Sequence, residues 1–227
     1  KGASKLVEDI QQMVYVNTPD FEGSLESGFS KSIEAIIQQL VQSTTEIDTN
    51  KALIIPNVNL KPIEVEKIKD TISLFGYEVF SLPDLSESLD GHLGLKQGAL
   101  TSGGISVEDI KKLGNSSLVF TIGQSVEKCG SKILEKNPNI KVFHFDSLGG
   151  LEASDKFFKV LCKVKNISQP HPSIVRWRKR HQDALLDTHF VIGSSKVIIA
   201  LEPDQALSVA NTIIEAGKML VESGAEV

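Results

Sequence analysis

The sequence predicts an α/β protein in which parallel β-strands are flanked by helices. Short β-prone apolar runs alternate with amphipathic helical patterns along most of the 227 residues. Parallel strands need a crossover, usually a helix, so this alternation favours Rossmann-like parallel sheets covered on both faces. Hydrophobic residues make up 41% and charged residues 23%, the balance of a globular protein with a sizeable core.

The first of these units occupies the start of the chain. Met13–Val16 is a β-prone run that stops at the turn-forming cluster Asn17-Thr-Pro-Asp20. From Leu25 to Val41 apolar residues recur at intervals of three and four, which predicts one amphipathic helix. The polar stretch Gln42–Asn50 then marks a boundary. Residues 1–48 are therefore predicted to be the C-terminal part of a first α/β domain.

A repeated pattern of strand, turn and helix follows over residues 49–167, which we interpret as a central Rossmann-like domain. Gly76 and the pair Ser106 and Asp109 give the signals of a helix end and of a capping box. The predicted strands are Ala52–Ile55, Tyr77–Leu82, Leu118–Ile122 and Lys141–Phe145. The predicted helices are Ile63–Leu74, Ser106–Gly114, Val126–Glu135 and Leu151–Val164.

The last part of the chain breaks this rhythm at Ser168–Pro172, which contains two prolines. A long helix is predicted from Ser173 to about Asp187, then a buried parallel strand at Lys196–Leu201 and a helix over Asp204–Val221. Residues 168–227 are thus predicted to be a linking helix and the start of a third, truncated α/β domain. We expect a fragment of a longer protein, with unpaired strands and exposed apolar surface that favour self-association.

Charge and cysteine content narrow the functional class. Lys and Arg number 24 against 29 Asp and Glu, a net charge of -5, so bulk attraction to nucleic acid or to a membrane surface is not expected. No apolar stretch is long enough to span a membrane and no secretory leader opens the chain, which predicts a cytoplasmic protein. Cys129 and Cys162 form neither a disulfide framework nor a metal knuckle, and we expect both thiols to be buried and inert.

Ligands of doubly wound folds bind at the loops that follow the strands, yet none of these loops carries a phosphate fingerprint. Gly123-Gln-Ser125 lacks the further glycines of a dinucleotide loop. His144 is expected to be a hydrogen-bonded core histidine, and Ser102 and Ser125 have no base nearby in sequence, so no catalytic residue is predicted. The loops in question are Asn17–Gly23, Pro56–Lys61, Pro83–His92, Gly123–Ser125, Asp146–Gly150 and Glu202–Asp204.

The predicted long helix carries the richest polar cluster. His181 and His189, with Asp183 and Asp187, are spaced too widely for two imidazoles to share one metal ion from one helix, so no metal ligand is predicted. The basic stretch Arg176–Arg180 is either a solvated face or a grip for a phosphate or an acidic partner. The candidate partner-binding residues are Arg176, Arg178, Arg180, His181 and His189.

Several segments together resemble β-type subunits of the nitrogenase component 1 family. Asn17-Thr-Pro-Asp-Phe-Glu-Gly23 with Gly28-Phe29 resembles the segment NTPxFxGxxxxGW, with Phe29 in place of tryptophan. Leu82-Pro-Asp-Leu-Ser-Glu-Ser-Leu-Asp-Gly-His-Leu93 is similar to the LPDxSxSLDGH segment of the branch that assembles the iron–molybdenum cofactor. Further similar segments are Thr101–Ser106, Leu113-Gly, Thr121–Gly123, Arg178–Phe190 and Ile199–Asp204.

The resemblance implies a scaffold rather than a catalyst. Such a chain pairs with NifE in an α2β2 complex, where an iron–sulfur precursor is matured with molybdenum and homocitrate. The nitrogenase iron protein docks there, and the nitrogenase molybdenum–iron protein accepts the finished cofactor. The full complex carries a [4Fe–4S] cluster and the cofactor precursor, whereas this fragment is expected to bind none tightly, because Cys129 and Cys162 match no cluster ligand of the family.

The same resemblance points to Asp20, Phe21 and Gly23 as neighbours of the interface cluster. Asp20 stands where the catalytic β subunit carries a serine close to that cluster, and a carboxylate can ligate iron or bond to one of its ligands. The alternative is a simple Asx turn after a strand. Two other functions stay open, namely the β subunit of a nitrogenase-like reductase and an unrelated nucleotide- or sugar-binding α/β protein.

Overall fold

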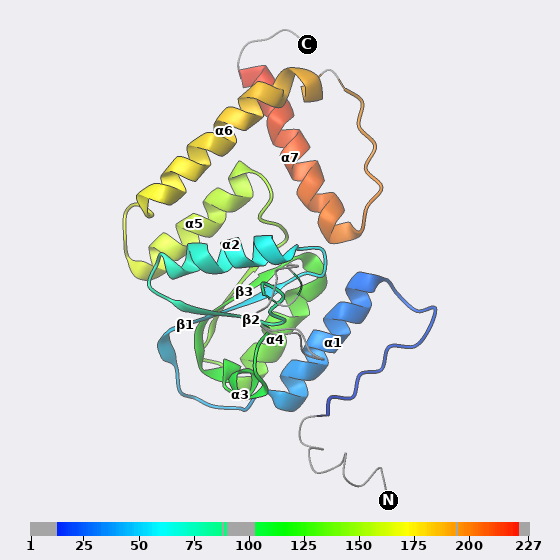
Figure 1. Ribbon diagram of the computed structural model, residues 1–227, viewed down its shortest axis with the longest axis vertical. Helices are drawn as coiled ribbons and strands as arrows, with labels where there is room; N and C mark the ends of the chain where they lie inside the picture. Colours follow the sequence, from blue (N-terminus) through cyan, green and yellow to red (C-terminus); the bar gives the residue numbers. More distant parts are fainter. Residues whose placement is uncertain (1–12, 88, 90–102, 194, 223–227) are drawn as a thin grey trace, which may run out of the picture.

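The computed structural model describes residues 13–87, 89, 103–193 and 195–222. Its centre is a parallel four-stranded sheet in the order β2-β1-β3-β4 (Figure 1). The α/β class predicted from the sequence is therefore confirmed. The strands are β1 (Asp48–Pro56), β2 (Glu78–Ser81), β3 (Ser116–Ile122) and β4 (Lys141–Phe145).

The two inner strands are apolar on both faces, as strands of a covered parallel sheet must be. Successive side chains of a strand point to opposite faces, so Ala52 and Ile54 of β1 lie on one face while Leu53 and Ile55 lie on the other. All four are fully buried. The β-branched isoleucines suit this pleated surface.

Helices cover both faces and make a three-layer sandwich (Figure 1). Ile37 and Ile133 join Leu53 and Ile55 in one core, and Ile72 and Phe157 join Ile54 in the other. The first face is covered by α1 (Leu25–Leu40), α3 (Val107–Lys111) and α4 (Glu127–Lys136), and the second by α2 (Pro62–Ser73) and α5 (Leu151–Lys165).

Two longer helices complete the described chain. Helix α6 (Pro172–Gly193) runs away from the sheet, the segment after it returns to the carboxyl edge of the sheet, and α7 (Pro203–Glu222) then runs from that edge back to the far end of α6 (Figure 1). The short 3-10 helices η2 (Leu113–Asn115) and η3 (Gln124–Val126) flank β3. None of the helices in the described part of the chain is both long and apolar enough to cross a membrane.

Local signals place several helix ends where they were predicted. Ser106 Oγ accepts a hydrogen bond from the Asp109 N–H at 3.1 Å and so caps α3. Gly76 adopts φ +80 just beyond α2, a left-handed conformation that favours glycine. Ser24 and Ser27 form a reciprocal cap at the start of α1.

Two predicted strands are wrong. Met13–Val16 and Lys196–Leu201 are extended but belong to no sheet. Instead, both backbone groups of Tyr15 bond to the side-chain amide of Gln39, which donates at 2.8 Å and accepts at 3.0 Å. A β-prone run becomes a strand only beside a second strand, and the described residues place none next to either segment. The division into parts 1–48, 49–167 and 168–227 stays a prediction.

Candidate functional site

The candidate site lies at the topological switch point of the sheet, between the carboxyl ends of β1 and β3. The chain leaves β1 toward β2 on one side and leaves β3 toward β4 on the other, which opens a crevice in a parallel sheet. Asn57 follows β1 and Gly123 follows β3. Both residues continue the hydrogen bonding of the sheet beyond the strands. The Asn57 N–H donates to the Ile122 carbonyl at 2.9 Å, and the Gly123 N–H donates to the Phe145 carbonyl at 2.8 Å.

Helix α7 lies over this crevice and leaves a cleft of about 500 Å³ beneath it. Four of the six loops singled out from the sequence contribute to this region, namely those after β1, β3 and β4 and the one that enters α7. The apolar lining comes from Leu60, Ile63, Ile68, Leu148 and Val209, and polar lining from Asn57, Asn59, Ser147, Gln205 and Ser208.

A carboxylate of the chain itself occupies the turn after β3. Asp204, only 2% exposed, accepts hydrogen bonds from Ser125 Oγ at 2.6 Å and from the Ser125 N–H at 3.3 Å. The approach is possible because Gly123, at φ +117, has no side chain. A Cβ there would lie 2.6 Å from Asp204 Oδ2 and 2.7 Å from Asn57. The turn that could have received a phosphate is thus filled from within.

Glu26 ties three distant stretches of the chain together at the same point. This first-turn residue of α1 is 4% exposed, and its Oε1 accepts from the Asp204 N–H at 3.0 Å and from Asn59 Nδ2 at 2.7 Å. The Asp204 N–H belongs to the first turn of α7, whose N–H groups have no partner within the helix. Glu26 therefore caps α7 with a charged acceptor that suits the positive end of the helix dipole.

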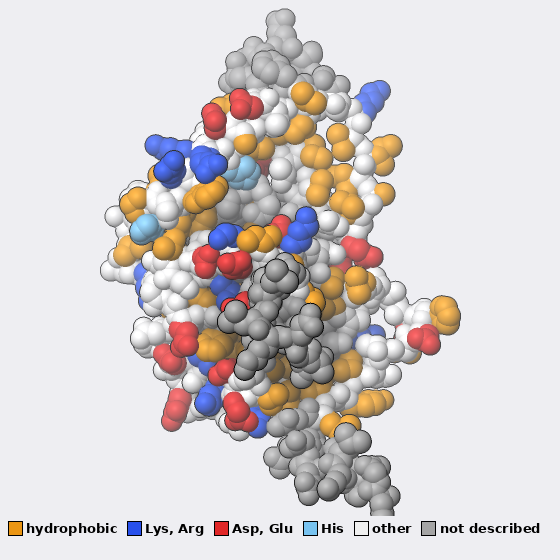
Figure 2. All heavy atoms as spheres, in the orientation of Figure 1, with side chains coloured by type: hydrophobic (Ala, Val, Ile, Leu, Met, Phe, Trp, Pro, Cys, Tyr) orange, Lys and Arg blue, Asp and Glu red, His pale blue; other side chains and the backbone are white. Residues whose placement is uncertain are grey.

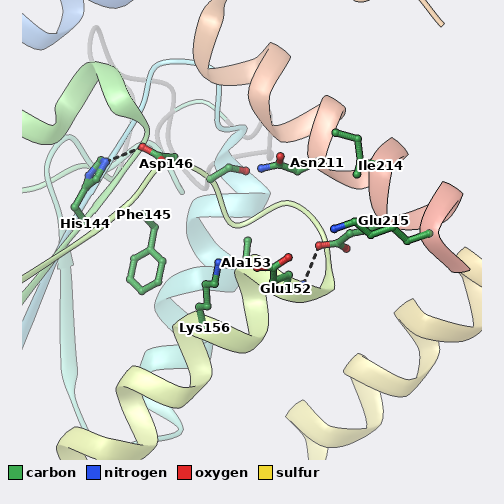
Figure 3. Close-up of a pocket in the computed structure, with 11 residues that line it drawn as sticks. His144, Phe145, Asp146, Glu152, Ala153, Lys156, Asn211, Ile214 and Glu215 are labelled. Carbon is green, nitrogen blue, oxygen red and sulfur yellow. Dashed lines mark hydrogen bonds and ion pairs between the residues drawn. The ribbon is translucent and has the colours of Figure 1, made fainter. Parts of the chain in front are cut away.

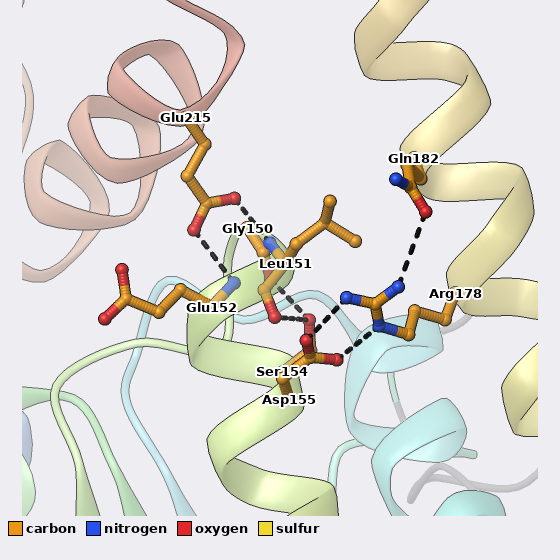
Figure 4. A network of polar contacts seen from close by, with 8 residues as sticks. All are labelled: Gly150, Leu151, Glu152, Ser154, Asp155, Arg178, Gln182 and Glu215. Carbon is orange, nitrogen blue, oxygen red and sulfur yellow. Dashed lines mark hydrogen bonds and ion pairs between the residues drawn. The ribbon is translucent and has the colours of Figure 1, made fainter. Parts of the chain in front are cut away.

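A second acid of α7 caps α5 in the same manner. Glu215 accepts hydrogen bonds from the N–H groups of Leu151 at 2.5 Å and Glu152 at 2.9 Å (Figure 4). Gly150, at φ +91, brings the backbone up to it, since a Cβ there would lie within 2.6 Å of the carboxylate. Both acids thus sit opposite a positive-φ glycine that follows a strand.

A smaller cavity of about 340 Å³ opens farther along α7, between that helix, α5 and the end of β4 (Figure 3). His144 borders it with both ring nitrogens bonded, to Thr121 Oγ1 at 2.9 Å and to Asp146 Oδ1 at 3.1 Å. The expectation of a hydrogen-bonded histidine is confirmed, although the ring is half-buried on an edge strand rather than in the core. Thr121 is fully buried, so this triplet offers no accessible nucleophile.

The residues expected near an interface cluster lie elsewhere, in the loop that precedes α1. Asp20, Phe21 and Gly23 are all exposed, and the Phe21 side chain is fully so. Phe21 and Gly23 have φ values of +64 and +80. An Asx turn would need a backbone N–H that donates to the Asp20 carboxylate. No such hydrogen bond occurs among those of the described residues. These three residues therefore stay a prediction.

The expected partner-binding residues all lie on α6, but they differ in what they contact. Arg176 and Arg180 are exposed, and the Arg180 guanidinium stacks over Trp177 at 4.3 Å from the ring centroid. Arg178 is engaged within the chain, where it makes a two-point ion pair with Asp155 of α5 at 2.7 Å for each bond (Figure 4). His181 is half-buried; His189 lies in α6, with its side chain outside the described set.

The hydrogen bonds from Arg178 hold the pKa of Asp155 below its ordinary value. The opposite happens at Cys129, where burial raises the pKa of the thiol to about 12. That thiol is fully buried as expected, whereas Cys162 is only half-buried, so the expectation of burial is wrong for the second cysteine. An iron–sulfur cluster needs several accessible thiolates. The described residues do not supply them, and no cluster of three potential metal ligands occurs among them.

Sequence reasoning missed Glu26 and Glu215. Each is an acid in an otherwise ordinary amphipathic helix, where a solvated role is the usual one. A signal for Glu215 was nevertheless present, because it follows Asp204 by about three helical turns and so shares its face. A second signal was the pair Gly149 and Gly150 before α5, because glycines at that position allow a carboxylate to approach the backbone closely.

Comparison with known proteins places the whole chain in one group. Residues 3–226 match the family model described as nitrogenase component 1 type oxidoreductase. The nitrogenase iron-molybdenum cofactor biosynthesis proteins NifN of Nostoc sp. and Mesorhizobium japonicum are 33% and 36% identical to it. These matches cover 92% and 91% of this chain but 46% and 45% of those proteins, so the chain spans about half their length. A solved structure described as nitrogenase Cp1 at pH 6.5 has a TM-score of 0.81 at 25% identity, over 99% of this chain and 54% of that one.

Proposed function

Because the chain belongs to the nitrogenase component 1 type oxidoreductase family, we propose that it is part of a scaffold subunit for assembly of the nitrogenase iron–molybdenum cofactor. The observation that carries the proposal is its identity of 33% and 36% to NifN proteins over about nine-tenths of its length. The LPDLSESLDGH segment at 82–92 supports the same branch, although residues 88 and 90–92 of it lie outside the described residues.

The proposed subunit pairs with NifE in a heterotetramer that holds and matures an iron–sulfur precursor. The nitrogenase iron protein docks on this complex, and the molybdenum–iron protein receives the product. In the complete protein a [4Fe–4S] cluster and the cofactor precursor are bound by groups outside this chain. The donor chemistry supports that division, since a fully buried thiol with a pKa of about 12 is a poor iron ligand.

The part of this chain nearest to a cluster is proposed to be the loop Asp20, Phe21 and Gly23. An exposed phenylalanine at positive φ is costly for an isolated molecule, which favours a contact that the loop makes in the complex. A Cβ at Gly23 would lie 2.2 Å from Ser27 Oγ. The absence of a side chain at Gly23 therefore lets the loop pass close to Ser27, which takes part in the cap of α1.

The exposed face of α6 is the proposed partner surface. Arg176, Trp177 and Arg180 give an aromatic ring between cationic groups, a combination enriched at protein interfaces. Figure 2 shows basic side chains gathered over this helix. Arg178, His181 and His189 stay in the proposal as residues of the same helix, with Arg178 acting by holding α6 on α5.

A second candidate function is the β subunit of a nitrogenase-like reductase that turns over substrate itself. The similar solved structure described as a nitrogenase favours it, at a lower identity of 25%. The family match excludes the other alternative, an unrelated nucleotide- or sugar-binding protein.

The test is anaerobic co-purification of the complete protein with tagged NifE, followed by iron analysis, electron paramagnetic resonance and a substrate-reduction assay. We expect a stable, iron-rich complex that reduces no dinitrogen by itself. Turnover of substrate by the purified complex would establish the reductase instead. Absence of both complex and iron would refute the scaffold proposal.

The partner surface is tested in the same experiment with Arg176→Glu and Arg180→Glu. Each substitution alone reverses one charge at the proposed interface and should weaken the complex by roughly tenfold. Lys128→Glu, an equal charge change on exposed α4, is the matched control and should leave the yield of complex unchanged. Equal yields for all variants would remove α6 from the partner surface and leave the scaffold proposal intact.

A further inference from the structure

The chain leaves the edge strand β2 through a polar cluster that is separate from the residues lining the cleft. The Leu82 N–H makes the last bond to the sheet, at 3.0 Å from the Ile54 carbonyl. The Asp84 carboxylate then accepts hydrogen bonds from Lys69 Nζ of α2 at 2.6 Å and from the Ser86 N–H at 3.1 Å. Lys69 Nζ also donates to Ser86 Oγ at 3.2 Å. One lysine of α2 therefore holds two residues of the segment that follows β2.

This ion pair differs from the other lysine–carboxylate pairs between described residues. The side chains of Lys69 and Asp84 are 25% and 12% exposed, and Ser86 is 5% exposed. Each of the other pairs joins positions three or four apart on one helix, and its carboxylate is more than half exposed. The pair formed by Lys69 is mostly buried and links residues that lie 15 positions apart in the sequence.

The hydrogen bonds keep Asp84 ionised despite its burial. Burial acts to raise the pKa of the Asp84 carboxyl group, but the hydrogen bonds from Lys69 and Ser86 outweigh it, so the pKa lies below its ordinary value. A charged pair in such a place adds little net stability, because the cost of removing both charges from water offsets their attraction. Its directional bonds instead fix the path of the chain out of β2. The Leu89 N–H then bonds to the Leu85 carbonyl at 3.3 Å in the turn that follows.

The segment directed in this way is the one by which the chain resembles the cofactor-assembly branch, residues 82–92. It follows β2 at the carboxyl edge of a parallel sheet, the edge at which such sheets bind their ligands. A segment can act at a defined place only if the residues that support its start are themselves held, because a small displacement there changes where the rest lies.

We propose that Lys69 is a positioning residue of the scaffold. Through Asp84 and Ser86 it fixes the direction in which segment 82–92 leaves β2, and delivery of the finished cofactor depends on that direction. This inference rests on the proposed scaffold function and names a residue that acts in it. Lys69 contacts neither cofactor nor partner in this role and acts only through the two residues that it holds.

The experiment uses the complete protein in complex with tagged NifE. The purified complex is supplied with molybdate, homocitrate and the iron protein. Cofactor delivery is measured as substrate reduction by a molybdenum–iron protein purified without its cofactor, and the melting temperature and iron content of the complex are recorded in parallel. Hydrogen exchange of the peptide that contains residues 82–92 reports how firmly the segment is held, and peptides from β1 and β3 report the core.

The variants are Lys69→Met, which removes the charge and keeps an apolar stem, and the double variant Lys69→Met/Asp84→Asn. The single variant leaves a mostly buried carboxylate without its cation and should lower the melting temperature. The double variant removes both charges and should restore the melting temperature to near the parent value. We expect delivery to fall roughly tenfold in both variants. In the double variant, exchange should accelerate in 82–92 and stay unchanged in β1 and β3.

Lys132→Met is the matched control. The Lys132 side chain is 26% exposed, almost the same as that of Lys69, and it pairs with Glu135 at 2.8 Å within α4. Loss of this pair should leave delivery, melting temperature and hydrogen exchange unchanged, because it links no second element.

The double variant separates a positioning role from a structural one. Recovery of delivery together with stability would mean that the pair only stabilises the fold, and this overturns the proposal. Unchanged exchange of 82–92 overturns it as well, because Lys69 would then not hold the segment. Absence of delivery by the parent complex refutes the scaffold function, and the role of Lys69 with it. A loss of delivery that persists at the parent melting temperature supports the positioning role.

Discussion

At the scale of single residues, Gly123 decides how closely α7 can approach the sheet. Its φ of +117 is disfavoured for every L-residue, and an added Cβ would meet Asp204 and Asn57 at 2.6 and 2.7 Å. We predict that Gly123→Ala lowers the free energy of unfolding by about 1–3 kcal/mol. Thermal or urea unfolding followed by circular dichroism measures this.

Gly28→Ala provides the matched control for that substitution. Gly28 lies inside α1, with nothing within 4 Å of its would-be Cβ. Alanine in a helix interior is favoured over glycine by about 0.5–1 kcal/mol, so this variant should be slightly more stable. If both variants lost equal stability, the clash at Gly123 would not be the cause.

The thiol of Cys129 gives a pH-dependent prediction. Its pKa is raised to about 12 by burial, so the reactive thiolate is scarce throughout the accessible pH range. Alkylation of Cys129 in the native protein should therefore stay negligible from about pH 7 to 9, where an ordinary thiol with a pKa of about 8.5 becomes strongly reactive. Quantitative mass spectrometry checks this, with urea-unfolded protein as the positive control. A rise in native labelling that follows an ordinary thiol titration would contradict it.

Residue roles were predictable from the sequence only where the residue type allows few alternatives. A histidine in a strand pattern must bond its ring nitrogens, and His144 does. An arginine in a basic run has many options, and the pairing of Arg178 with Asp155 depends on how α5 and α6 pack. Glu26 and Glu215 act across long sequence separations, which local patterns do not contain.

At the scale of elements, the helices and the central strands were predictable because their periodicity records burial. Every covering helix of the sheet starts and ends within a few residues of its predicted bounds, as do all four strands. Met13–Val16 and Lys196–Leu201 failed for the opposite reason. Composition predicts the propensity of a strand, whereas a strand also needs a neighbour to pair with.

The ion pair between α5 and α6 yields the prediction for this scale. The side chains of Arg178 and Asp155 are 40% and 25% exposed, so solvent screens their attraction. We expect a coupling energy of about 0.5–1 kcal/mol from a double-mutant cycle with Arg178→Ala and Asp155→Asn. The pKa of Asp155 is lowered in the folded state by the hydrogen bonds from Arg178. A depressed carboxyl pKa contributes stability above the unfolded pKa, and this contribution is lost as the pH falls through the folded value.

The difference in unfolding free energy between the parent protein and Asp155→Asn should therefore be constant near neutral pH, begin to fall near the ordinary Asp value of about 3.9, and vanish only below the lowered pKa of the folded state. Urea unfolding across a pH series measures it. Glu152→Gln, which removes an exposed pair on the same helix, controls for general charge effects. A difference that persisted far below that pH would show that the charge of Asp155 is not responsible.

At the scale of the whole molecule, we expect the apolar surface around the segment that enters α7 to govern how the chain associates in solution. Ile198 is 95% exposed, and Val197 and Leu201 are each nearly half exposed. Figure 2 shows hydrophobic side chains gathered at this place. An extended, apolar backbone without a neighbouring strand is a template for pairing with another chain. We expect the 227-residue chain to self-associate through this segment.

The substitution Ile198→Lys tests this expectation, because a lysine on an unpaired strand edge opposes edge-to-edge association. Sedimentation velocity at micromolar concentration should show the parent chain as a concentration-dependent mixture and Ile198→Lys shifted toward monomer. The melting temperature should stay the same, since the side chain supports no contact within the fold. Ile63→Lys, at a 52% exposed isoleucine on α2, controls for removal of any exposed apolar residue and should leave association unchanged. An equal loss of association in both variants would mean that general surface hydrophobicity, rather than the segment 196–201, joins the chains.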